Sequence, residues 1–125
     1  MTPLIFVLVA VSGGLGAASR LLLDGIIRTR VSNTFPWATI IINVSGSLVL
    51  GVVAGLAAGH LVSDGWYAVV GTGFLGGYTT FSTASFETVR LLQERKLLAG
   101  AANGLGVLAT TTLVAGLGLW IGSLF

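Results

Sequence analysis

Four apolar runs, each about long enough to cross a lipid bilayer, constrain this chain more than any other feature. They cover residues 3–23, 36–60, 66–92 and 97–124. A helix needs roughly 20 consecutive apolar residues to span the hydrocarbon layer. Charged residues make up only 8% of the chain, and the mean hydropathy is +1.00, so too little polar surface remains for a soluble domain. We therefore expect an all-α integral membrane protein, with residues 1–125 forming one four-helix transmembrane domain.

The remaining composition narrows the class of protein. No cysteine is present, which excludes a disulfide framework and a thiolate metal site. Six basic residues against four acidic ones are too few and too dispersed for a nucleic-acid partner. The N-terminal run has no basic region before it, so it is interpreted as a retained first span rather than a cleaved signal. The lipid bilayer is thus the expected surroundings, as for a multi-pass protein of the cell membrane.

The third run contains a predicted helix break near residues 76–80. Four glycines crowd into seven residues and two threonines follow at once: Gly71, Gly73, Gly76, Gly77, Thr79 and Thr80. This is a poor composition for a continuous helix. Lipid cannot satisfy the carbonyls and amides that a break frees, so a break persists only where it lines a cavity, binds an ion or meets another protein surface. The alternative is a glycine-rich packing helix whose threonines bond back to their own carbonyls.

Polar side chains follow this break at helical spacing. Two neighbouring faces carry them: Thr80, Thr83 and Glu87 on one, Ser82 and Ser85 beside it. Hydroxyls donate hydrogen bonds to an anion as readily as they accept them. Phe81 lies next to these faces, and the edge of its ring carries partial positive charge that favours an anion; the alternative for Phe81 is a lipid-facing or core position. A polar track for an anion is therefore one reading of the third run.

Two further polar groups lie within the apolar runs. Asn43 has Thr39 one turn before it on the same face. An amide in hydrocarbon needs partners, so Asn43 either bridges helices or faces a wet path. Arg20 is close to the end of its run, and Asp24 at i+4 is its expected ion-pair partner.

The second and fourth runs carry small residues at helical spacing. These are Gly51, Gly55 and Gly59 on one, and Gly118 and Gly122 on the other. Small residues four apart let helices approach closely in lipid. The fourth run adds Asn103 and three threonines at 110–112, of which at least one is expected to face inward. A unit this small encloses little, so any passage that it forms is expected to need a second subunit.

Three segments together resemble a known family. "GAASR" in the first run, "TIIINVSGS" in the second and "GTGFLGGYTTFST" in the third resemble the CrcB/Fluc family of fluoride channels. The resemblance implies a fluoride-selective channel, not an enzyme, which passively exports fluoride from the cytoplasm of a prokaryote and reduces its toxicity. It also implies a dual-topology dimer of antiparallel subunits with two pores.

The resemblance assigns roles to individual residues. A structural sodium ion (Na+) at the dimer centre would be held by the backbone carbonyls of Gly76 and Thr79. The residues implied for the fluoride pore are Asn43 as donor, Phe81 as an aromatic wall, Thr39, Ser82, Thr83 and Thr111 as hydroxyls, and Glu87 near one pore end.

One position departs from the family pattern. A second phenylalanine usually follows the first by three residues, whereas this chain has Ala84 there. Phe86, two residues on, points to a different helix face. The second aromatic contact in each pore is therefore in question.

Charge placement bears on the partner. Alternating spans put the first and third connections on one side of the membrane, and every basic residue lies toward that side: Arg20, Arg28, Arg30, Arg90, Arg95 and Lys96. The positive-inside rule then favours a single orientation, with both termini outside the cytoplasm. An antiparallel homodimer needs both orientations, so a heterodimer with an oppositely inserted homologue stands as the alternative to a homodimer.

Two other functions compete with a channel. An exporter like the small multidrug-resistance proteins also has four short spans, but proton coupling needs a carboxylate within the membrane, typically in the first helix; the first run has none until Asp24. A non-conducting membrane assembly subunit explains the packing glycines but not the predicted break, the hydroxyls and Asn43 together.

Overall fold

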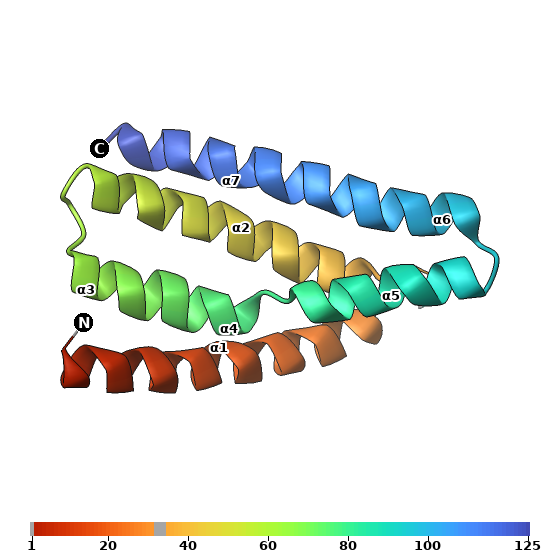
Figure 1. The fold of residues 1–125 in the computed structure, drawn as a ribbon, viewed down its shortest axis with the longest axis horizontal. Coiled ribbons are helices and arrows are strands. Elements are labelled where there is room, and N and C mark those ends of the chain that lie inside the picture. Colours follow the sequence, from red (N-terminus) through yellow and green to blue (C-terminus); the bar gives the residue numbers. More distant parts are fainter. Residues whose placement is uncertain (1, 32–34) are drawn as a thin grey trace.

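The computed structural model describes residues 2–31 and 35–125 of the chain, and the described part is helical with short connections. Figure 1 shows long helical rods lying side by side, with the two termini at the same end of the molecule. The elements in chain order are α1 (Pro3–Arg28), α2 (Trp37–Ala58), α3 (Asp64–Tyr67), η1 (Ala68–Leu75), α4 (Gly76–Tyr78), α5 (Phe81–Gln93), α6 (Leu97–Ala101), η2 (Ala102–Gly106) and α7 (Val107–Ser123). The two η elements are π-helical segments.

Three helices of the described part are long and apolar enough to cross a membrane. They are α1, α2 and the continuous helix Leu97–Ser123. The described part is therefore all-α, as expected, and includes three candidate membrane spans. The segment between them, from Asp64 to Gln93, is helical on both sides of two extended residues.

Helix α1 extends farther than expected, and one ion pair within it differs from the prediction. The sequence placed the end of the first run at Leu23, but the helix continues to Arg28. Asp24 pairs with Arg28, whose Nε lies 2.9 Å from the Asp24 carboxylate. The predicted Arg20–Asp24 pair is therefore wrong. An acid that precedes its base by four residues has the better orientation for a helical pair, and this pair lies in the extra turn.

Glycines bring α2 and the last helix into close contact. A methyl group added at Gly118 would collide with the carbonyl of Leu48, and one at Gly51 with the carbonyl of Ala115. Gly55 and Gly122 are packed equally closely, so the predicted small-residue interface is confirmed for these four. Gly59 takes no part, because it follows the end of α2 as its C-cap.

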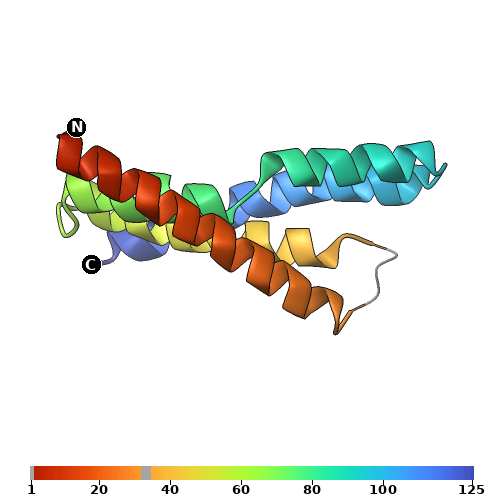
Figure 2. The same ribbon diagram turned by 90° about the horizontal axis from the view of Figure 1, so that it is seen from below.

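The helices spread apart at one end of the molecule, which we call the open end. Figure 2 shows α5 and α6 diverging from the ends of α1 and α2, whereas the opposite half is a close bundle of α1, α2, α3 and α7. The divergence starts at the two extended residues, which lie between these halves.

Candidate functional site

Two extended residues interrupt the third helical run. Helix α4 ends at Tyr78, Thr79 and Thr80 have ψ angles of 157° and 121°, and α5 begins at Phe81. Thr80 is the N-cap of α5, and its Oγ1 accepts the backbone N–H of Thr83 at 3.2 Å. A threonine at this position supplies an acceptor for an amide that has no helical partner.

Asn43 of α2 binds the interruption at two points. Its Nδ2 donates to the carbonyl of Thr80 at 2.8 Å, and its Oδ1 accepts the N–H of Thr80 at 2.8 Å. The side chain is 8% exposed. Both backbone groups of Thr80 are thus satisfied by one amide, which lowers the cost of leaving helical geometry inside an apolar protein. Asn43 is therefore a bridge between helices.

The same contacts release two carbonyls. In a continuous helix the N–H of Thr80 would donate to Gly76, and that of Thr83 would donate to Thr79. The first donates instead to Asn43 and the second to Oγ1 of Thr80. Gly76 and Thr79 therefore lose their helical donors. The carbonyl of Gly77, by contrast, accepts Nε of Arg20 at 3.3 Å.

A cavity of about 490 Å³ lies beside the interruption. Four of the predicted site residues line it: Asn43, Thr79, Phe81 and Thr111. Ala84 also lines it, where the family pattern has phenylalanine. The ring of Phe81 lies at the cavity and is 86% exposed. Thr111 is the half-buried member of the three threonines, and its hydroxyl donates to the carbonyl of Val107 at 2.7 Å.

Other predicted hydroxyls lie elsewhere. A second, smaller cavity of about 140 Å³ is lined by Thr39 and Thr83 together with Arg20 of α1. Thr80 lines both cavities. Ser82 is exposed and lines neither of them. The hydroxyls of the predicted track are therefore divided between two spaces that meet at Thr80.

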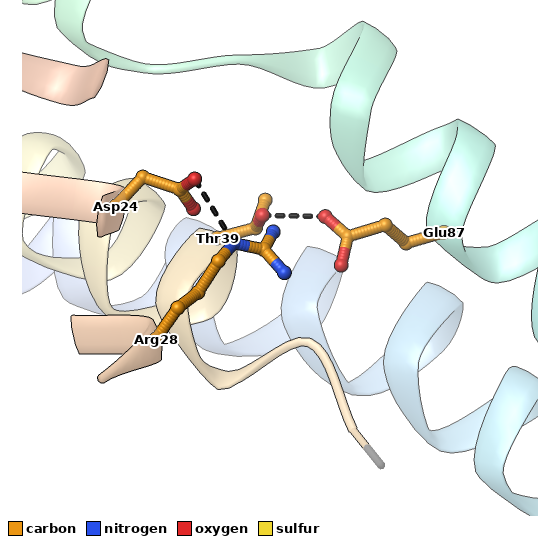
Figure 3. Close-up of polar contacts among 4 residues, drawn as sticks. All are labelled: Asp24, Arg28, Thr39 and Glu87. Carbon is orange, nitrogen blue, oxygen red and sulfur yellow. Dashed lines mark hydrogen bonds and ion pairs between the residues drawn. The ribbon is translucent and has the colours of Figure 1, made fainter. Parts of the chain in front are cut away.

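Glu87 of α5 is buried against α2. It is 4% exposed, and its Oε1 accepts the hydroxyl of Thr39 at 2.5 Å. Figure 3 shows this contact beside the Asp24–Arg28 pair of α1, with the guanidinium of Arg28 directed toward Glu87. Thr39 is thus the hydrogen-bond partner of Glu87, whereas Arg28 pairs with Asp24.

One buried polar pair, Asn103 with Thr88, was not predicted from the sequence. Asn103 of η2 is 2% exposed, and its Nδ2 donates to Oγ1 of Thr88 at 2.7 Å. Both residues line the larger cavity. The signal was an amide within an apolar run, but its partner is 15 positions away in the sequence.

Comparison with known proteins gives concordant matches. Residues 7–122 match the family model described as "CrcB-like protein, Camphor Resistance (CrcB)". The chain is 54% identical over 124 residues to fluoride-specific ion channel FluC 1 of Leifsonia xyli subsp. xyli, covering 99% of this chain and 90% of that protein. It is 46% identical to FluC 2 of Cutibacterium acnes, covering 92% and 94%. It is 39% identical to FluC of Syntrophotalea carbinolica, with the same coverage.

Proposed function

Since this chain belongs to the CrcB family of membrane proteins, we propose that it is a fluoride-specific ion channel. The observation that carries the proposal is the match over 99% of the chain to a relative that bears this name. Fluoride would leave the cytoplasm passively through the cell membrane, driven by the membrane potential, and its toxicity would fall.

The larger cavity supports a route for the anion. Its wall combines two side-chain amides, those of Asn43 and Asn103, with several hydroxyls and the exposed Phe81. A dehydrated anion needs donors of this kind, without a fixed cation that would hold it. Asn43 uses one of its two N–H groups on Thr80, and an amide nitrogen carries two donors. The second donor is the group that we assign to fluoride.

We assign the membrane topology from the helices and the charges. The three apolar helices make three crossings, and the interrupted run Asp64–Gln93 makes the fourth. In Figures 1 and 2 the C-terminal ends of α1 and α5 both lie away from the end that holds the two termini. The basic residues gather toward these two helix ends, so this side would face the cytoplasm.

The open end of the molecule supports pairing with an oppositely oriented subunit. Apolar residues such as Leu98 and Leu105 are 85% and 71% exposed near this end. Phe81, which lines the larger cavity, is also exposed. The partner would be a second copy of this chain or a homologue that inserts the other way. A homologue would supply the aromatic side chain that Ala84 lacks.

A structural sodium ion fits the interruption. Gly76 and Thr79 present carbonyls that have lost their helical donors, and unwound carbonyls are the ligands that membrane proteins use for sodium. Two carbonyls are fewer than a hard cation takes, so the same pair of the partner subunit would complete the shell. Bound there, the ion would supply positive charge that fixes the two interruptions against each other.

Fluoride efflux from liposomes tests the proposal. Vesicles would hold this purified chain alone, and a fluoride electrode would report efflux, with chloride as the control anion. Rapid fluoride-selective efflux supports a channel in which this chain suffices. If folded protein gives no efflux, the measurement is repeated with an oppositely inserted homologue; no fluoride flux with either partner refutes the proposal.

A further inference from the structure

The hydroxyls that line the larger cavity differ in where their hydrogens point. A hydroxyl has one hydrogen to donate, and this hydrogen is the part of the group that attracts an anion. The four threonines of the cavity wall donate it to oxygens of the protein: Thr79 to Leu75 at 2.9 Å, Thr80 to Thr83 at 3.3 Å, Thr88 to Ala84 at 2.9 Å and Thr111 to Val107 at 2.7 Å. The hydrogens of these threonines are therefore already engaged.

The two serines of the same wall are different. Within the described part of the chain, the hydroxyls of Ser47 and Ser85 form no hydrogen bond, and both residues are half-buried. A serine in a helix often bonds back to a carbonyl of the preceding turn, as Ser45 does to Ile42 at 3.1 Å. The only buried side-chain polar atom without a partner in that part is Nε of Arg90. The two serine oxygens are therefore accessible, and each keeps a hydrogen to donate.

Each serine lies one turn from a residue of the proposed anion route. Ser47 follows Asn43 by four residues on α2. Ser85 follows Phe81 by four residues on α5. Residues at this spacing share a helix face. Asn43 is bonded to Thr80, the residue before Phe81, so both pairs start beside the interruption.

The two helices carry the serines to opposite sides of the interruption. From there α2 runs toward the end that holds the termini, whereas α5 runs away from that end (Figure 1). A helical turn rises about 5.4 Å, so Ser47 and Ser85 each lie roughly one turn from the level of Asn43. Free donors therefore follow one another along the cavity, in the order Ser85, Asn43 and Ser47.

The charge of the cavity wall suits an anion that must leave again. Among the described residues, those that line the larger cavity include no lysine, arginine, aspartate or glutamate. Conduction requires binding that is favourable enough for entry but weak or divided among several sites, so that the ion can move on. Neutral donors one turn apart meet this requirement.

We propose that Ser47 and Ser85 bind fluoride through their free hydroxyls, one on each side of the amide of Asn43. The inference rests on the proposed fluoride-channel function and adds two direct contacts with the ion. Fluoride would pass from one hydroxyl to the amide and then to the other hydroxyl.

Removal of each hydroxyl tests the proposal. Fluoride efflux would be measured at a series of fluoride concentrations for the wild type, Ser47→Ala, Ser85→Ala and the double variant, each in the conducting assembly. Each single change is expected to raise the concentration for half-maximal efflux about tenfold, because a hydrogen bond to an ion is lost. The double variant is expected to show a larger shift than either single variant. A purely structural role would lower only the maximal rate, since fewer channels would be active.

Ser45→Ala is the matched control. Ser45 lies on α2 two residues before Ser47 and is also half-buried, but it lines neither cavity and its hydroxyl is engaged. Its removal is expected to leave the half-maximal concentration unchanged. Elution volume and thermal unfolding report whether each variant is folded. If an alanine variant is not, cysteine takes its place, because it keeps the side-chain size and donates only weakly.

Three results would overturn the inference. They are an unchanged half-maximal concentration in the two serine variants, a loss of maximal rate alone, or an equal shift in Ser45→Ala. The wild type reports on the channel function separately. Absence of wild-type efflux in every assembly refutes that function, whereas rapid wild-type efflux without a shift in the variants refutes only the two serine sites.

Discussion

At the scale of single residues, Asn43 has two tasks that the sequence offered as alternatives. It bridges α2 to the interruption through both backbone groups of Thr80, and it lines the larger cavity. The bridge fixes the orientation of the amide, so that its remaining N–H has a defined direction. A rigidly held donor loses little entropy when an anion binds.

Asn43→Ala is expected to reduce fluoride flux more than Asn103→Ala. The first change removes the proposed pore donor and the clamp on Thr80, whereas the second removes a contact between Asn103 and Thr88. Each variant would be compared in the liposome efflux assay after elution as a dimer. Equal flux in the two variants would contradict the role assigned to Asn43.

At the scale of elements, the contact between α2 and α7 is set by backbone proximity. Gly118 packs against the carbonyl of Leu48, while Gly116 on the same helix has nothing within 4 Å of an added Cβ. The two glycines therefore form a matched pair for a test of close packing. Lipid gives little hydrophobic drive for helix association, so this contact depends on fit.

Gly118→Ala is expected to lower the stability of the protein by about 1–3 kcal/mol, the usual cost of forcing extra atoms into a packed interface. Gly116→Ala is expected to leave it unchanged or raise it slightly, because alanine favours helix. Thermal unfolding in detergent measures both. A loss of the same size at Gly116 would mean that helix packing is not the cause.

Two helices are followed by a non-glycine residue in the left-handed backbone conformation, which is sterically strained. His60 and Arg95 have φ angles of 63° and 61°, and the residue after each donates back into the helix, Leu61 to Leu56 and Lys96 to Leu91. Glycine is the usual residue in this conformation because it has no Cβ. The backbone strain at each of these two residues is therefore local, and a substitution by glycine would remove it.

His60→Gly is expected to stabilise the protein by about 1 kcal/mol, since it removes the steric cost of the left-handed conformation. His60→Ala keeps that cost and serves as the control. Thermal unfolding distinguishes them, and a stability gain in the alanine variant equal to that in the glycine variant would exclude backbone strain as the reason.

At the scale of the whole molecule, the interruption and the charge distribution together define what a partner must supply. The proposed sodium site takes two carbonyls from this chain, those of Gly76 and Thr79, and the apolar surface at the open end is exposed. We propose that one subunit inserted in the opposite direction supplies both the remaining carbonyls and the cover.

Replacing sodium by N-methyl-glucamine is expected to lower the thermal unfolding midpoint of the dimer, because a ligand that binds only the folded assembly stabilises it by mass action. Potassium at the same concentration is the control for ionic strength. An identical midpoint in all three salts would argue against the sodium site.

A reporter fused to the C-terminus is expected to lie outside the cytoplasm when this chain is expressed by itself, because the basic residues gather at the opposite end. Two reporters measure this directly when each is fused to the C-terminus. One is active only inside the cytoplasm, and the other is active only outside it. Equal signals on both sides would remove the reason for invoking a heterodimer and favour a homodimer.

Run length, hydropathy and glycine content are local properties, so the class of protein and the position of the helix interruption could be predicted from the sequence. The apolar runs predicted membrane helices, and the crowded glycines before Thr79 and Thr80 marked where helical geometry ends. The motifs in the first three runs were sufficient to identify the family.

The sequence could not predict which side chains lie in contact across the helices. The contacts that define the site join residues 37, 48 and 57 positions apart: Asn43 with Thr80, Thr39 with Glu87, and Arg20 with Gly77. Spacing along one helix predicted that Arg20 pairs with Asp24. Instead, Arg20 donates to the carbonyl of Gly77 near the interruption, and Asp24 pairs with Arg28. Such choices depend on how the helices pack, because hydrogen bonds and charges act over a few ångströms in space and not along the chain.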